Sequence, residues 1–142
     1  MSDFAVDGLD HVHVSVRDRE AAAAWYGRVL GLVPAAEHAG WAADPRGPLF
    51  LATPAGAHCL ALFAGEPAQG GDHTVAFRVD DEAFARFRDR VGTLGLKDRH
   101  GGAVGPGDVV DHGGAFSFYF CDPDGNRIEL TTYDPVAVDG DG

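Results

Sequence analysis

The chain carries one local pattern twice: a strand-like segment, a helix-capping aspartate and an amphipathic helix. In the first copy Val12, Val14 and Val16 alternate with polar residues, as in a strand with one buried face. Asp18 then precedes a helical pattern that ends at Gly31. Because a strand and a helix recur in the same order, the sequence predicts two related modules that combine both.

The second copy has the same order of signals. The residues that the two copies share at a constant offset are Asp10 and Asp72, His11 and His73, Asp18 and Asp80, Glu20 and Glu82, and Val29 and Val91. After each helix, short apolar runs bounded by Gly and Pro predict about three further strands. We therefore predict an α+β chain, a single domain over residues 1–142, built from two βαβββ modules at about 9–64 and 72–133.

Charge excludes two classes of partner. The 22 acidic residues outnumber the 11 Lys and Arg, and the formal net charge of -11 repels both nucleic acids and anionic membranes. The N-terminus lacks the basic and apolar regions of a signal peptide, and no apolar stretch approaches the length of a membrane span. Two cysteines are too few for a disulfide framework. We expect a cytoplasmic protein that binds neither nucleic acid nor membrane.

Three segments carry a resemblance to a known family. They are His-Val-His-Val-Ser-Val-Arg-Asp at 11–18, Trp-Tyr-Gly-Arg-Val-Leu-Gly-Leu at 25–32 and Phe-Tyr-Phe-Cys-Asp-Pro-Asp-Gly-Asn-Arg-Ile-Glu-Leu at 118–130. With the repeated module, they resemble the vicinal oxygen chelate superfamily of glyoxalase I, extradiol dioxygenases, fosfomycin-resistance thiol transferases and bleomycin resistance proteins. The resemblance covers about residues 9–133. It implies a glyoxalase-like curved mixed sheet around a cavity, often completed in a homodimer, and a metal-binding site for two substrate oxygens.

The resemblance also implies the metal ligands. His11 matches the ligand on the first strand, and Glu129 matches the carboxylate on the last strand. His73 is the candidate ligand of the second module, because it lies as far before Asp80 as His11 lies before Asp18. The alternation of apolar residues in that strand instead places Thr74 at the ligand position. Since a slip of one residue turns a side chain to the opposite face, the choice between His73 and Thr74 stays open at this point.

The donor set suits several metals. Two imidazoles and one carboxylate bind Fe, Mn, Ni or Zn and leave positions for a substrate that offers two oxygens. His13 shares the strand face of His11, where it is a fourth ligand, a proton shuttle or a polar wall. Glu129 and His13 are thus the candidate catalytic groups. The residues that we expect to line the substrate site are Trp41, His58, His112 and Tyr119.

Two classes of function fit these features. The first is a metal-dependent small-molecule enzyme of the glyoxalase/dioxygenase type, either a lyase or isomerase or a dioxygenase, in which the ion polarises a bound oxygen. The alternative is a metal-free protein of the bleomycin-resistance type, which binds and sequesters a drug. In both cases the partner is a small molecule, and the resemblance implies a homodimer. The Gly-rich segment 101–114 predicts an irregular loop between these elements.

Overall fold

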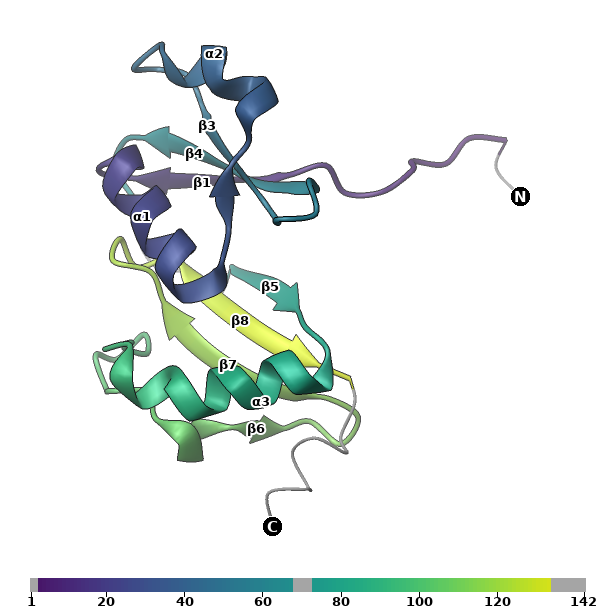
Figure 1. Ribbon diagram of the computed structural model, residues 1–142, viewed down its shortest axis with the longest axis vertical. Coiled ribbons are helices and arrows are strands. Elements are labelled where there is room, and N and C mark those ends of the chain that lie inside the picture. The colour runs from purple at the N-terminus through teal and green to yellow at the C-terminus, as the bar shows by residue number, and fades with distance from the viewer. Residues whose placement is uncertain (1–2, 68–72, 134–142) are drawn as a thin grey trace. The chain divides into compact units, whose positions relative to one another are not determined.

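The computed structural model describes residues 3–67 and 73–133. The chain forms two compact units, Met1–Pro67 and Ala68–Gly142, each with a four-stranded mixed sheet (Figure 1). Each unit has the predicted order of one strand, one main helix and three strands. The α+β class is therefore confirmed. Among the described residues, no helix has the length and apolar character needed to cross a membrane.

Unit 1 has a sheet with the strand order β1-β4-β3-β2. Its elements are β1 (Val12–Val16), α1 (Arg19–Leu30), β2 (Val33–Pro34), η1 (Ala36–His38), α2 (Ala39–Ala42), β3 (Leu49–Ala52) and β4 (His58–Ala64). Strand β1 runs parallel to β4, and the other two neighbouring pairs are antiparallel. A parallel first pair requires a crossover, and α1 lies in that connection.

Helix α1 begins and ends where the sequence predicts. The Asp18 carboxylate accepts a hydrogen bond from the backbone N–H of Ala21, and Gly31 follows the helix with a φ of 71°. The helix packs against β3 and β4, and Tyr26 is completely buried. Because α1 covers one face of the sheet, the polar residues of β1 lie on the opposite face.

Unit 2 repeats this arrangement with the strand order β5-β8-β7-β6. Its elements are β5 (Thr74–Arg78), α3 (Asp81–Arg90), η2 (Val91–Thr93), η3 (Pro106–Asp108), β6 (Val110–Asp111), β7 (Phe116–Cys121) and β8 (Arg127–Thr132). Asp80 caps α3 by accepting from the N–H of Ala83. The rings of Phe84 and Phe87 pack on Phe118 of β7, and this aromatic cluster joins α3 to the sheet.

Two connections of unit 2 differ in how well the sequence predicts them. The turn between β7 and β8 is confirmed, with Gly125 at φ 87° and its N–H donating to the Asp122 carbonyl. The segment 101–114 is more regular than predicted, since it contains η3 and β6. The Asp108 carboxylate accepts from the N–H of Gly105 at 2.7 Å, and this side-chain bond forms the short helical turn within a Gly-rich stretch.

Candidate functional site

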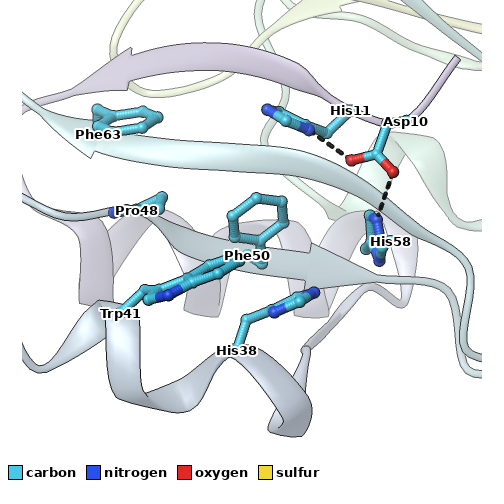
Figure 2. Close-up of a pocket in the computed structure, with 8 residues that line it drawn as sticks. All are labelled: Asp10, His11, His38, Trp41, Pro48, Phe50, His58 and Phe63. Atoms are coloured by element: carbon cyan, nitrogen blue, oxygen red, sulfur yellow. Dashed lines mark hydrogen bonds and ion pairs between the residues drawn. The ribbon is translucent and has the colours of Figure 1, made fainter.

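Unit 1 contains a cavity of about 570 Å³. Its lining residues are Asp10, His11, His38, Trp41, Pro48, Phe50, His58 and Phe63, and Figure 2 shows them around one hollow. They come from β3, β4, the η1–α2 segment, and the residues directly before β1 and β3. A volume of this size suits a small organic molecule.

Aromatic side chains form most of the cavity wall. Phe50 on β3 pairs with Ala61 on β4, and both belong to a buried cluster that Phe63 packs against. His38 and Trp41 are three residues apart, and their rings stack with centroids 4.4 Å apart and planes 4° apart. The Trp41 ring also lies 5.4 Å from that of Phe50. The predicted lining residue Trp41 therefore belongs to this cavity wall.

Asp10 links two histidines of the cavity. Its Oδ2 lies 2.7 Å from His11 Nδ1, and its Oδ1 lies 3.0 Å from His58 Nε2 (Figure 2). Hydrogen bonds to His11 and then His58 hold the pKa of the Asp10 carboxyl below its usual value. An ionised carboxylate thus orients both imidazoles and leaves the remaining nitrogen of each ring for another partner.

A group of potential metal ligands lies beside this bridge. Glu37, His38 and His58 each offer one ligand atom, and these atoms lie within 4.8 Å of one another. Glu37 is exposed, whereas the two histidines are half-buried. The sequence predicts His58 as a lining residue but gives no role to Glu37 or His38. Their positions depend on η1, which brings the segment 36–38 to the start of β4.

The face of the unit 2 sheet opposite α3 carries a fixed carboxylate. Glu129 on β8 is paired with Tyr119 on β7 and with Ala76 on β5. Ser117 Oγ donates to Glu129 Oε2 at 2.7 Å, and Ser117 is completely buried. Burial, followed by the negative charge of Glu129, raises the pKa of the Tyr119 hydroxyl. The carboxylate therefore lies between a buried donor and a phenol that stays protonated at neutral pH.

A guanidinium group lies next to this carboxylate. The carbon atom of the Arg127 guanidinium is 4.4 Å from the centroid of the Tyr119 ring, and Nη1 donates to Thr74 Oγ1 at 3.2 Å. On the other side, His112 Nε2 lies 3.0 Å from the Tyr119 hydroxyl. The structure therefore brings the predicted residues Glu129, Tyr119 and His112 together. Arg127 is not among the predicted site residues, although its position two residues before Glu129 places it on the same strand face.

The register of β5 bears on the choice between His73 and Thr74. Thr74 pairs with Arg127, and Ala76 pairs with Glu129. Thr74 therefore lies on the strand face of Glu129, in agreement with the apolar alternation. His73 directly precedes β5 and is exposed, so the alternation within the strand does not fix its direction. Its role as a metal ligand stays a prediction.

His13 occupies the same sheet face as the cavity residues of unit 1. Its ring stacks on Phe63 with centroids 4.1 Å apart, and the residue is exposed. The predicted residues thus form two groups. His11, His13, Trp41 and His58 belong to unit 1, whereas His73, His112, Tyr119 and Glu129 belong to unit 2.

Known proteins share both the sequence pattern and the fold. The chain is 33% identical over 135 residues to the fosfomycin resistance protein FosX of Mesorhizobium japonicum, covering 89% of this chain and 86% of that protein. The structure of the oxidase ChaP-H1 is 28% identical, with a TM-score of 0.63 over 92% of this chain and 98% of that one. FosX of Listeria monocytogenes, in a mutant complexed with Mn(II) and 1S,2S-dihydroxypropylphosphonic acid, gives a TM-score of 0.67 at 18% identity, with coverage of 94% and 98%.

The family assignment covers both units. Residues 8–130 match the family described as the Glyoxalase/Bleomycin resistance protein/Dioxygenase superfamily. This range includes the first module, the second module as far as residue 130, and the three segments that carry the resemblance. The protein belongs to the glyoxalase/bleomycin resistance protein/dioxygenase superfamily.

Proposed function

We propose that this protein is a metal-dependent enzyme that acts on a small molecule through two oxygens bound to a divalent ion. The observation that carries the proposal is Glu129, whose carboxylate accepts a hydrogen bond from buried Ser117 on the sheet face opposite α3. The relationship to FosX supports it, because a FosX protein has been solved with Mn(II). The metal-free sequestering function is not favoured, since these relatives point to a metal.

The proposed ligands are His11, His73 and Glu129. His11 uses Nδ1 toward Asp10, which leaves Nε2 for an ion, and Glu129 uses Oε2 toward Ser117, which leaves Oε1. Such outer partners are typical of metal ligands because they fix the direction of the donor atom. Nitrogen and carboxylate donors fit Mn, Fe, Ni or Zn. When bound, the ion would supply Lewis acidity toward an oxygen of the substrate.

Other residues bind and orient the substrate in this proposal. Arg127 offers a positive charge to an anionic group, in a chain whose net charge is otherwise -11. Tyr119 stays protonated and can donate a hydrogen bond to the substrate. Within unit 1, the aromatic wall of the cavity suits an apolar part of a small molecule. Glu129 and His13 are the proposed groups that hold or move a proton.

Fosfomycin is the first substrate to test. The protein is incubated with fosfomycin and Mn(II), and the products are followed by phosphorus NMR with and without a chelator. We expect conversion that the chelator abolishes. Conversion that continues without metal would contradict the proposal, as would the absence of any binding of Mn(II), Fe(II), Ni(II) or Zn(II). Binding without conversion would keep the metal site and exclude fosfomycin as its substrate.

Replacing Ser117 with Ala should weaken Mn(II) binding by about 10-fold. The change removes the hydroxyl that donates to Glu129 Oε2, and loss of an outer partner of a ligand costs about 10- to 100-fold in metal affinity. Isothermal titration measures the dissociation constant, and Ser117→Thr, which keeps the hydroxyl, serves as the matched control. An unchanged affinity for Mn(II) in Ser117→Ala would contradict the role of Glu129 as a metal ligand.

We also expect a homodimer. The family resemblance implies one, and β1 and β5 are edge strands of their sheets, a position that natural proteins commonly cover. Size-exclusion chromatography with light scattering should report about twice the chain mass of 14.9 kDa. A mass that stays near that of one chain at micromolar concentration would contradict the expectation.

A further inference from the structure

We propose that Glu37, His38 and His58 bind a second divalent ion of the Zn(II) type, within unit 1. These residues take no part in the ligand set proposed above, so the inference does not depend on the proposed function. It rests on a cluster of three donors, two imidazole nitrogens and one carboxylate oxygen, which lie within 4.8 Å of one another. Two nitrogens and one oxygen are a ligand set that Zn(II) uses in proteins.

The spacing is close to that of a bound site. Zn(II) binds nitrogen and oxygen at about 2.0–2.2 Å, so tetrahedral ligands lie roughly 3.4 Å apart. The observed limit of 4.8 Å exceeds this value by about 1.4 Å. Glu37 is exposed, and its flexible side chain can move by that amount without disturbing the core. The histidines, which are half-buried, set the position of the ion.

Asp10 acts as the positioning residue of this site. Its Oδ1 accepts a hydrogen bond from Nε2 of His58 at 3.0 Å, which places the proton of a neutral imidazole on Nε2 and leaves the lone pair on Nδ1 for a cation. A carboxylate on the outer nitrogen of a ligating histidine is a common feature of zinc sites. The hydrogen bond to Asp10 therefore gives His58 the orientation that a metal ligand needs.

His38 is held in a similar way by ring contacts. It stacks on Trp41 at 4.4 Å, and its centroid lies 5.2 Å from that of His58 in an edge-on arrangement. Both histidines line the cavity (Figure 2). An ion at this point would join η1 to the start of β4. Because three protein ligands leave at least one tetrahedral position, it would also bind water or an anionic ligand at the cavity.

The test counts ions in the full chain without a histidine tag. After equilibrium dialysis against Zn(II), we expect two ions per chain in the wild type and one in Glu37→Gln or His38→Ala. Glu129→Gln should also retain one ion, and the double variant His38→Ala with Glu129→Gln should retain none. Glu66→Gln and His100→Ala are matched controls at exposed positions outside both ligand sets, and both should bind as the wild type does.

Trp41 gives a second readout that is specific to this site. Because its ring stacks on His38, Co(II) bound there should quench its fluorescence. We expect the quenching to persist in Glu129→Gln and to disappear in Glu37→Gln and His38→Ala. Trp41→Phe should lose the quenching while keeping the number of bound ions. This variant separates the optical signal from binding.

The outcomes distinguish the two metal proposals. If Glu37→Gln and His38→Ala both keep the wild-type number of ions and the quenching, the unit 1 site is wrong. If the wild type binds one ion that His38→Ala loses and Glu129→Gln keeps, the unit 1 site stands and the site of the proposed function fails. If the wild type binds one ion that Glu129→Gln loses and His38→Ala keeps, the site of the proposed function stands and the unit 1 site fails.

Discussion

Replacing Glu129 with Gln should raise the dissociation constant for Mn(II) by more than about 100-fold, because loss of an outer partner alone costs about 10- to 100-fold. The change removes the negative charge of the proposed ligand and conserves its volume. The amide oxygen of glutamine can still accept from Ser117 Oγ, so the contact across β7 and β8 can be kept. Titration calorimetry measures the affinity, and circular dichroism checks the fold.

Three comparisons make this result specific. Glu66→Gln removes the same charge at an exposed position of unit 1 and should leave the affinity unchanged. Titrations are made in the His38→Ala background, which removes the second site proposed in unit 1. His73→Ala and Thr74→Ala, measured side by side, decide which residue of the second module is the ligand. If Glu129→Gln binds Mn(II) as tightly as the wild type in that background, Glu129 is not a ligand.

The sequence predicts those parts of the fold that depend on interactions between residues close together in the chain. Asp18 and Asp80 each accept from an N–H three residues later, an interaction that depends only on the neighbouring backbone. Gly31 and Gly125 have positive φ angles, which glycine adopts without steric cost. These signals predict the starts of both main helices, the end of α1 and the last hairpin, because none of them depends on packing between distant residues.

The donor cluster of unit 1 could not be predicted because its causes are not local. The segment that carries Glu37 and His38 has no apolar period, and β4 meets β3 with a shift in register next to His58. The Arg19 side chain also donates to the carbonyls of Ala42 and Gly47, at 2.8 and 2.6 Å, and so holds the end of α2. Such contacts join residues that are distant in the sequence.

The disagreement over His73 has a visible origin in the strand ends. In the first module the last strand residue, Val16, stands two positions before its cap, and Arg78 stands two positions before Asp80. Val16 is buried, whereas Arg78 is exposed. Residues at the same distance before the capping aspartate therefore lie on opposite sheet faces in the two modules. Counting back from the cap and counting by alternation must then differ by one residue.

Replacing Phe118 with Ala should reduce the free energy of unfolding by about 3–5 kcal/mol, the usual cost of deleting a large buried aromatic side chain. Phe118 is completely buried on β7, and its ring lies 5.3 Å from Phe84 and 5.4 Å from Phe87. Removing it leaves a cavity between α3 and the sheet and deletes both ring contacts. The same sheet carries Glu129 on its other face, so Phe118→Ala should also weaken the binding of metal at Glu129.

Urea denaturation followed by far-ultraviolet circular dichroism measures this loss. Both tryptophans, Trp25 and Trp41, lie in unit 1, so fluorescence would not report directly on the unit that contains Phe118. Leu9→Ala, at a residue that is 84% exposed, is the control and should change the free energy by less than about 0.5 kcal/mol. A loss below about 1 kcal/mol in Phe118→Ala would mean that its ring is not packed between α3 and β7, because no well-packed core closes over a missing phenyl group at so small a cost.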